Sequence, residues 1–432
     1  MVNPKEILTL LGIPAEKVEH FDFVEGINEP SRIMLTLLEN RTSCPHCGSS
    51  DVVVHGYYKT NINNSIIKAN KLYVEVDVRR YKCKKCGKTF KTNYSFYYKN
   101  KHISRAVDIA LKEDLKQMTT YTNLARQYDV STNYVIKLFD SLPRQKRLPL
   151  PSVICVDEFH FSNAKNKKCK FPFVMSNPFT GEIIEIIESR TRDYLWSYFI
   201  RLSIQERSKV KYYVSDMNET YRSLKKAFFP NSIHIIDHFH IVKLFSTAIQ
   251  KVRTRIMKNE EYDSKEYLFL KRNWKLFLSE RSKLRKYRKI NKRTGEVYDF
   301  ETLIDATLNK YNDLYYVYWT REEFCKYVKS LHYYMETREM MTFFVKKFTH
   351  SEIKEVQEIG FTISRWFEEI VNSYAKNTTG FVLTNAIAEA NNDNIQTLVD
   401  ISYGLGNFER LRNRILYINR NKKLDRMSRS SS

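Results

Sequence analysis

The sequence has 432 residues, of which 42% are hydrophobic and 28% are charged. That length suits two to four domains of ordinary size, and the apolar content is enough for packed cores, which excludes a disordered chain. Lys and Arg total 72 against 49 Asp and Glu, so the formal net charge is +23. A balance this positive favours a polyanionic partner, and nucleic acid is the first candidate.

An anionic membrane surface would also attract this charge. However, no window of the sequence approaches the roughly 18 apolar residues that a membrane-spanning helix needs. The first residues, MVNPK, also lack the apolar region of a signal peptide. We therefore expect an intracellular protein that has no membrane partner.

Residues 1–40 mix short helical patterns with Asn and Pro, and we treat them as a separate N-terminal segment. Residues 41–98 then contain two Cys-x-x-Cys pairs, each followed by glycine: Cys44, Cys47, Cys83 and Cys86. Zinc takes four soft ligands in a tetrahedron, and a two-residue spacing lets both sulfurs of a tight turn reach one ion. Four unrelated buried thiols would not explain the doubled spacing. We therefore predict a zinc-ribbon domain with one structural zinc ion.

Strand-like runs at 52–54 and 72–78 lie between the two cysteine pairs, as in a zinc ribbon that carries an insert. We expect the nearby His46 and His55 to be bystanders, because four thiolates already complete the zinc shell. The other cysteines are scattered, which does not indicate a disulfide framework: Cys155, Cys169 and Cys325.

Residues 99–148 turn helical, and the stretch from Thr122 to Lys137 follows the pattern helix, short turn, helix. Ser131 or Thr132 would cap the second helix, which would enter the major groove of DNA. Ordinary packing of two helices is the alternative, but the basic residues nearby favour DNA contact. The candidate DNA-binding residues are Ser131, Thr132, Asn133, Tyr134, Lys137, Arg144, Lys146 and Arg147.

The stretch Leu148-Pro149-Leu150-Pro151 is a stiff hinge that marks a domain boundary. From 149 to 239, short apolar runs alternate with helical patterns, and a turn at 177–181 favours antiparallel pairing of the runs beside it. This pattern predicts the first part of an α/β core with a mixed sheet. The expected strands are 153–156, 171–176, 182–188, 211–215 and 232–236, and the expected helices are 193–202 and 218–227.

Residues 240–375 are rich in Lys, Glu, Tyr and Phe and contain almost no Gly or Pro, which predicts an all-α insertion. Its tryptophans, Trp274, Trp319 and Trp366, are expected in the core or on helix faces. Residues 376–432 are expected to supply the last part of the α/β core and a C-terminal helix with a polar tail.

Three acidic residues lie where a metal-dependent DNA-cutting site needs them. Asp157 and Asp216 each end an apolar run, and Glu389 lies on a predicted late helix. Carboxylates at the ends of buried strands can converge on hard divalent cations, which polarise phosphate and activate water or a hydroxyl. Each residue also has a structural alternative: Asp157 as a strand-end turn residue, Asp216 as a helix N-cap and Glu389 as a solvent-facing helix residue.

Three further residues are candidate site-adjacent groups: Asp237, His240 and Asn392. Asp237 competes with Asp216 for the place of the second acid, although we favour a structural or site-adjacent place for it. His240 could position a phosphate or a water, or could simply be satisfied at a helix start. Asn392 shares one helix face with Glu389 because the two are three residues apart.

Seven segments carry a resemblance to a known family. They are Cys44-Pro45-x-Cys47-Gly48, Cys83-x-x-Cys86-Gly87, Val156-Asp157-Glu158-Phe159, Val214-Ser215-Asp216-Met217, Asp237-His238-Phe239-His240, and Asn385-Ala386-x-x-Glu389-Ala390-x-Asn392 with Tyr403-Gly404-x-x-Asn407-Phe408. Together they resemble the ISL3 family of insertion-sequence transposases. In that family the segments correspond to the zinc-binding domain, the first two catalytic strands, a (Cys/Asp)-x-x-His element before a helical insertion, and the segment with the final acid.

The resemblance implies an α/β catalytic core with a ribonuclease-H-like mixed sheet, interrupted by an all-α insertion and preceded by a zinc ribbon and a helix-turn-helix. It implies a DDE transposase that binds terminal inverted repeats and both cleaves and transfers DNA strands. Asp157, Asp216 and Glu389 would be catalytic and would hold two Mg²⁺ (or Mn²⁺) ions. The implied partners are double-stranded DNA of transposon ends and target and a second copy of the chain, without ATP, in the bacterial cytoplasm at the nucleoid.

This chain departs from the family pattern at three positions of the late helix. Ala386 and Ala390 stand where the resemblance would expect Gly, and Gln396 stands where it would expect a basic residue. These departures bear on DNA contact by that helix. Two other functions stay open from the sequence: a DNA-binding regulator without catalysis, and a metal-dependent nuclease without joining activity.

Overall fold

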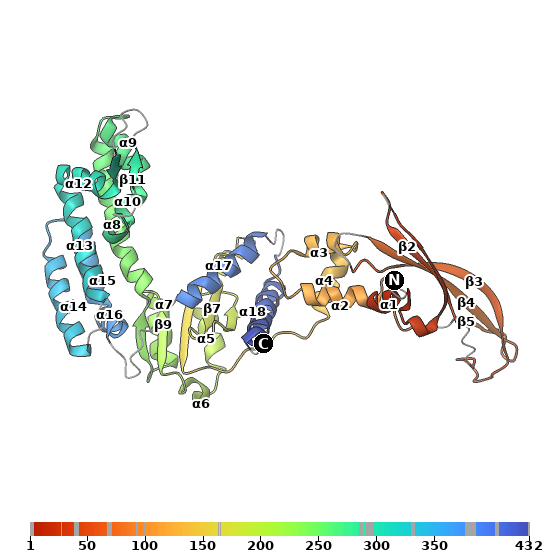
Figure 1. Cartoon of the computed structure of the whole chain (residues 1–432). Coiled ribbons are helices and arrows are strands. Elements are labelled where there is room, and N and C mark those ends of the chain that lie inside the picture. The colour runs from red at the N-terminus through yellow and green to blue at the C-terminus, as the bar shows by residue number, and fades with distance from the viewer. Residues whose placement is uncertain are drawn as a thin grey trace. The chain divides into compact units, whose positions relative to one another are not determined.

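The computed structural model describes residues 4–430 apart from several short segments. These are 27, 39–42, 67–70, 92–93, 99–100, 163, 165, 285–287, 291–296, 330–332, 376–385 and 402–405. The chain forms two compact units, one of residues 1–146 with 397–432 and the other of residues 147–396 (Figure 1). No helix in the described part of the chain is both long enough and apolar enough to cross a membrane.

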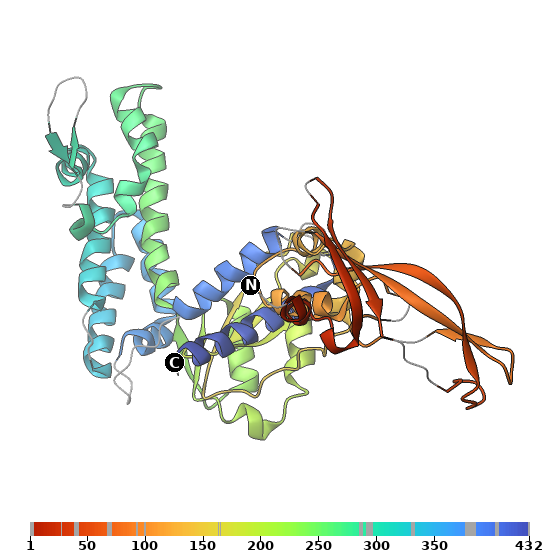
Figure 2. The same ribbon diagram turned by 45° about the vertical axis from the view of Figure 1, so that its right-hand side comes forward.

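The first unit contains a sheet in the order β1-β2-β4-β3, with β5 paired to the far end of β4. β2 and β4 are parallel, and the other neighbours are antiparallel. β3 and β4 form a long two-stranded ribbon (Figure 2). The elements are α1 Pro4–Leu10, a 3-10 turn Ala15–Lys17, β1 Val18–Val24, β2 Ser31–Leu37, β3 Val52–Asn63, β4 Leu72–Cys83 and β5 Thr89–Lys91.

The sequence of β4 shows why this sheet forms, because its residues alternate between two environments. Val74, Val76 and Val78 are fully buried in the core, whereas Glu75 and Asp77 belong to the opposite face. The strands run well beyond the stretches expected between the cysteine pairs. β1 and β2 were not predicted at all: β1 is an edge strand with mostly exposed residues, so it carries little apolar alternation, and its pairing with β2 holds it in place.

Three helices follow in the first unit, α2 Arg105–Asp114, α3 Tyr121–Gln127 and α4 Thr132–Asp140. Each begins after a residue whose side-chain oxygen accepts a hydrogen bond from a main-chain N–H of the first turn: Ser104, Thr120 and Ser131. The helices share a core around Leu111, Leu124 and Val135, all fully buried. The predicted helix, turn and helix at 122–137 are therefore present, with Ser131 as the cap.

The C-terminal helix α18 (Phe408–Ser430) packs against these helices and belongs to the first unit. The side chain of Arg414 is buried and donates hydrogen bonds to the main-chain oxygens of Leu115 and Gln117, just after α2. Burial lowers the pKa of Arg414 to about 10. Arg410 donates two hydrogen bonds to Asp140 at the end of α4. Residues 397–432 thus lie with the helical pattern of 99–148, whereas the sequence grouped them with the α/β core.

The second unit is built on a mixed sheet in the order β10-β9-β6-β7-β8. β7 pairs antiparallel with both β6 and β8, whereas β9 is parallel to both β6 and β10. The predicted strands and helices of this region are all present. They are β6 Val153–Glu158, β7 Phe173–Ser176, β8 Ile183–Ile187, α5 Arg192–Phe199, β9 Tyr212–Ser215, α7 Glu219–Phe228 and β10 Ile233–Ile236, with short additional turns at Lys167–Cys169 and Ile204–Arg207 (α6).

The two faces of this sheet differ. On one face, Ile154 and Val156 of β6 pack with Leu195 of α5 and Leu224 of α7 in a large aromatic core. On the other face, Cys155, Val214 and Ile235 form a small separate cluster. Because successive residues of a strand point to opposite faces, β6 contributes to both.

Residues between β10 and 375 form the expected helical insertion, with one exception. Its helices are α8 His238–Asn259, α9 Lys265–Arg272, α10 Trp274–Leu278, α11 Arg281–Leu284, α12 Phe300–Lys310, α13 Asn312–Val328, α14 Tyr334–Thr349, α15 Lys354–Arg365 and α16 Phe367–Tyr374. The exception is a two-stranded hairpin of β11 Arg288–Ile290 and β12 Val297–Asp299. α14 and α15 approach closely at Gly360, where a Cβ would lie 2.6 Å from the main-chain nitrogen of Thr349.

The beginning and the end of this insertion are joined at β10. The hydroxyl of Ser373 in α16 donates to the carbonyl of Ile236 (2.7 Å) and accepts from its N–H (2.9 Å). The ring of His238 donates through Nε2 to the carbonyl of Ser373, 2.7 Å away. Arg222 of α7 also donates two hydrogen bonds to Glu369 of α16. The insertion thus leaves the sheet and returns to it at nearly the same place.

Candidate active site and metal centre

Three aspartates follow one another across the parallel part of the second sheet. The small cluster of Cys155, Val214 and Ile235 marks one face of three neighbouring strands. The residues two positions further along each strand continue the same face, because side chains repeat with a period of two. Those residues are Asp157, Asp216 and Asp237. Since β6, β9 and β10 run parallel, their carboxyl ends meet at one edge of the sheet, and the three carboxylates gather there.

Asp157 is held at both carboxylate oxygens. Oδ1 accepts a hydrogen bond from the N–H of Glu158 (2.8 Å), and Oδ2 accepts one from the side-chain amide of Asn392 (2.6 Å). Burial raises the pKa of Asp157 to about 7, and the neighbouring negative charges of Glu158, Asp216 and Asp237 also raise it. The carboxylate therefore lies in a place that lacks positive charge.

Asp216 is also buried, and its Oδ1 has no hydrogen-bond partner among the residues that the structure describes. Burial raises its pKa to about 7, and the charge of Glu158 contributes to that shift. The helix that follows is capped by Asn218, whose side chain accepts from the N–H of Thr220. Asp216 is therefore not the N-cap, and that structural alternative from the sequence is wrong.

Asp237 has a structural task as well as a place beside the other acids. It is the N-cap of α8, and its Oδ1 accepts from the N–H of Phe239 (3.4 Å). The residue is only 3% exposed, and its Oδ2 makes no hydrogen bond to any described residue. The Nε2 atom of His240 lies 3.9 Å from that oxygen. Burial lowers the pKa of His240, so its ring is neutral near pH 7.

Glu158 points to the opposite face from Asp157, and it has partners that the sequence did not reveal. Its carboxylate accepts hydrogen bonds from the guanidinium of Arg190 and the hydroxyl of Tyr221. Arg190 follows β8, and Tyr221 is a buried residue of α7. These contacts connect the end of β6 with α7 and with the segment after β8, on the face of the sheet opposite Asp157. No local motif could have shown them, since the partners are 32 and 63 residues away in the chain.

The late helix α17 (Ala386–Ile401) reaches this site through Asn392. Glu389 lies on α17 one turn before Asn392, on the same face of the helix by its three-residue step. The side chains of Ala386, Glu389 and Ala390 lie outside the described residues. The predicted late helix is thus present, and it contacts the strand that carries Asp157.

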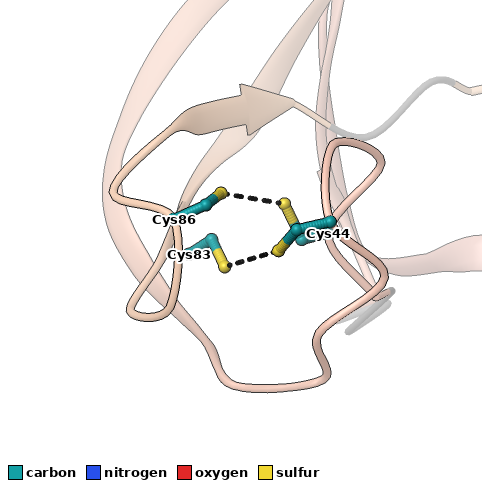
Figure 3. A group of neighbouring side chains, drawn as sticks. Cys44, Cys83 and Cys86 are labelled. Carbon is teal, nitrogen blue, oxygen red and sulfur yellow. Dashed lines mark hydrogen bonds between the residues drawn. The ribbon is translucent and has the colours of Figure 1, made fainter.

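The second candidate centre is the group of four cysteines in the first unit. The Sγ atoms of Cys44 and Cys86 are 3.6 Å apart, as are those of Cys47 and Cys83, and the thiols point toward one another (Figure 3). Among the described side chains, this is the one set of three or more His, Cys, Asp or Glu ligand atoms that all lie within 4.8 Å of one another. Neither His46 nor His55 belongs to it.

The main chain prepares these thiols for a metal. Gly48 and Gly87 follow the two pairs with φ of +72° and +70°, a conformation in which other residues are strained. The N–H groups of Cys86 and Lys85, together with hydrogen bonds from the neighbouring thiols, lower the pKa of Cys83 to about 7, which favours the thiolate that zinc binds. Burial and the thiols of Cys83, Cys86 and Cys44 raise the pKa of Cys47 to about 11. The doubled Cys-x-x-Cys-Gly spacing therefore predicted the geometry correctly.

Comparison with known families decides what kind of protein carries these two centres. Residues 154–415 match the family model of DDE transposases of the ISL3 group, described as "Transposase". This match covers more than half of the chain. The chain belongs to the ISL3 family of transposases. Residues 40–86 match a second family model, described as "zinc-finger of transposase IS204/IS1001/IS1096/IS1165", and no curated protein matches the sequence.

The cysteine centre of this transposase is therefore the zinc site of its N-terminal ribbon. The residues that match the transposase family model include all three aspartates and α17. A transposase acts on DNA, and the positive charge of the chain agrees with such a partner.

Several of the predicted DNA-binding residues of this transposase form hydrogen bonds within the protein. Ser131 caps α4, and the hydroxyl of Tyr134 donates to Asp108. Arg147 donates two hydrogen bonds to Glu206, at 2.5 and 2.9 Å, and a third to the carbonyl of Leu148. The remaining predicted residues comprise Thr132, which is half-buried, and four exposed ones: Asn133, Lys137, Arg144 and Lys146.

Proposed function

We propose that this transposase recognises the terminal inverted repeats of an insertion sequence and carries out both DNA cleavage and strand transfer at one DDE site. Asp157, Asp216 and Glu389 are the proposed catalytic residues. One observation carries the proposal: Asp157 and Asp216 end neighbouring parallel strands on the same face of the sheet, and α17, which bears Glu389, is attached to Asp157 through Asn392.

The chemistry of the aspartates supports a divalent cation. Two buried carboxyls have pKa values near 7, and one oxygen each of Asp216 and Asp237 is buried without a partner in the described part of the chain. Such groups favour a nearby positive charge. Hard cations such as Mg²⁺ and Mn²⁺ prefer carboxylate oxygens.

We propose that Asp157, Asp216 and Glu389 hold two magnesium or manganese ions. When bound, such ions polarise the phosphate and lower the pKa of an attacking water or hydroxyl. In the first step, water attacks the phosphodiester at the transposon end and a 3′-hydroxyl leaves. In the second, that hydroxyl attacks a target phosphodiester and another 3′-hydroxyl leaves. Each step exchanges one P–O bond for another, so neither ATP nor a covalent protein intermediate is required.

The protein supplies position and surroundings for these steps. The amide of Asn392 fixes one oxygen of Asp157, and the Arg190–Glu158–Tyr221 contacts hold the end of β6 from the other face. Asp237 and His240 are proposed as site-adjacent groups. The sheet, with three antiparallel strands and two parallel ones added beside β6, supports a ribonuclease-H-like core.

DNA recognition is proposed for the helix-turn-helix of α3 and α4. The exposed side chains of Asn133 and Lys137 lie on α4, and Arg144 and Lys146 follow it. A second copy of the chain is the proposed partner when DNA is bound, so that two transposon ends are handled together.

The test uses the DNA that flanks the gene, labelled and offered as a duplex with Mg²⁺ or Mn²⁺. Asp157→Asn, Asp216→Asn and Glu389→Gln should each lose cleavage by about a thousandfold or more, because several kcal/mol of charge stabilisation are removed at about 1.4 kcal/mol per tenfold. Binding of the duplex should persist in all three. Asp193→Asn, an exposed residue of α5, is the control.

Three other results would contradict the proposal. Normal cleavage by the three variants would remove these residues from the site. Binding by the wild-type protein without any nicking would favour a DNA-binding regulator. Nicking without a strand-transfer product would favour a nuclease.

A further inference from the structure

One face of the zinc ribbon carries cations that its fold does not neutralise. The face of β4 that buries Val74, Val76 and Val78 continues beyond the core with Arg80 and Lys82. Both of these side chains are exposed. Burial along β4 changes phase at Arg79 and Arg80, opposite a bulge in β3 between Val54 and Gly56, and beyond it Tyr81 and Cys83 are the buried residues. The positions that continue the apolar face by the two-residue period of a strand are thus basic and exposed.

The neighbouring strands add to this basic face. Lys91 of β5 lies directly opposite Arg80, and Thr89 lies opposite Lys82. The guanidinium of Arg80 donates to the hydroxyl of Thr89 (2.9 Å), and the ammonium of Lys91 lies 5.4 Å from the centre of the Tyr58 ring on β3. We call Tyr58, Arg80, Lys82 and Lys91 the ribbon patch.

The opposite face of the same strands is arranged differently. There Lys59 pairs with Glu75 at 2.6 Å, and Arg79 pairs with Glu19 at 3.1 Å. Among the described residues, no ion pair includes Arg80, Lys82 or Lys91. The ribbon therefore neutralises the cations of one face and leaves those of the other face for solvent or a partner.

The placement of Arg80 and Lys91 carries an energetic cost in the free protein. Like charges directly opposite each other on neighbouring strands are destabilising. Lys82 adds a third charge two residues, or about 6.6 Å, along β4. A row of phosphates would relieve this repulsion, since Lys and Arg side chains that reach phosphates release counterions and gain affinity.

We propose that the ribbon patch is a docking surface for the phosphate backbone of duplex DNA. The proposal rests on the DNA partner of the proposed function and names a surface separate from both the helix-turn-helix and the acidic site. Contacts of this kind position a protein on the duplex but do not read its sequence. The zinc ion would thus stabilise the end of a ribbon that binds DNA without recognising its sequence.

The test compares two triple variants of the full chain that have the same net charge. The patch variant is Arg80→Gln, Lys82→Gln and Lys91→Gln. The control variant is Lys59→Gln, Lys116→Gln and Lys251→Gln, in which each lysine has an acidic partner in the structure: Glu75, Glu113 and Glu358. Equilibrium binding is measured over a range of salt concentrations, with the flanking duplex and with a duplex of scrambled sequence.

The patch variant should bind both duplexes more weakly by about tenfold or more, and the slope of log K against log salt should fall by about 3, one per lost phosphate contact. The control should keep the wild-type slope. The patch variant should also retain zinc and melt no lower than wild type, because it loses repulsion rather than a packing contact. If the patch only stabilised the ribbon, the patch variant would melt at a lower temperature and would keep the wild-type salt slope.

Two results would overturn the proposal. One is a wild-type slope in the patch variant, and the other is an equal loss in the control, which would reduce the effect to net charge. Cleavage is a separate readout: a protein that binds through the patch but never nicks DNA contradicts the proposed function and leaves the patch intact. Anionic phosphatidylserine vesicles serve as a further arm, and loss of vesicle binding without loss of DNA binding would assign the patch to a membrane surface.

Discussion

The zinc centre and the acidic centre of this transposase are assembled in opposite ways. The four thiols come from two tight turns, and their sulfurs lie within 4.8 Å of one another. The aspartates come from the ends of three separate strands and lie in surroundings that raise the pKa of two of them. The structural metal site is thus formed by two turns, whereas the proposed catalytic site brings together carboxylates that need divalent cations to balance their charge.

The largest expected effect is that of disrupting the zinc site. Cys83→Ser, or zinc removal with a chelator, should unfold the ribbon and abolish DNA binding, because a structural zinc contributes about 10 kcal/mol or more of folding free energy in small zinc domains. Calorimetry should show that the transition of residues 147–396 is retained. Cys325→Ser, outside the cluster, is the matched control. A ribbon that stays folded without zinc would contradict the comparison.

The next effect concerns the link between the late helix and β6. Asn392→Ala removes the amide that donates to Asp157. Cleavage and Mn²⁺ affinity should each fall by about 10- to 100-fold, the usual cost of losing a group that orients a metal ligand. Asn394→Ala, an exposed residue of the same helix, should change neither. Unchanged Mn²⁺ affinity in Asn392→Ala would mean that α17 does not position the acid.

A third test concerns the pH dependence of the acidic site. Because the folded-state pKa values of Asp157 and Asp216 are raised from 3.8 to about 7, the folded protein binds these protons more tightly than the unfolded chain. The stability that they contribute is complete below about pH 3.8 and is lost as the pH rises to about 7, by up to about 1.4 kcal/mol per pH unit for each group.

Thermal melting with and without Mg²⁺ measures this dependence. Mg²⁺ should stabilise the wild-type protein more at neutral than at acidic pH, and Asp216→Asn should flatten the dependence. The zinc-ribbon transition provides the internal comparison, since the two aspartates lie in the other unit. Equal stabilisation by Mg²⁺ at both pH values would contradict the raised pKa values.

Much of this arrangement could be predicted because its signals are local. The doubled cysteine spacing revealed the zinc site, and short apolar runs followed by Asp157 and Asp216 revealed the ends of two buried strands. Asp237 was harder to interpret, because it is the N-cap of α8 and also lies beside the other acidic residues. Only the parallel register of three strands shows that it continues the same face.

The parts that sequence reasoning missed depend on partners far along the chain. β1 is an edge strand that becomes ordered by pairing with β2, and its own residues carry little pattern. The hairpin of β11 and β12 is three residues per strand, too short for a periodic signal. Arg147 is a basic residue of the kind that contacts DNA, but its guanidinium forms a hydrogen bond with Glu206. No spacing rule in the sequence could reveal that pairing.

The closure of the insertion at β10 has an evolutionary consequence. Ser373 and His238 join its outgoing and returning segments at the last residue of one strand, and Arg222 ties the return to α7. The end of β10, which is followed by Asp237, is thus held by residues at both ends of the insertion. That appendage could be lengthened, shortened or exchanged among relatives while the strand ends keep their places, which makes it the natural part of the molecule for divergence in partners or control.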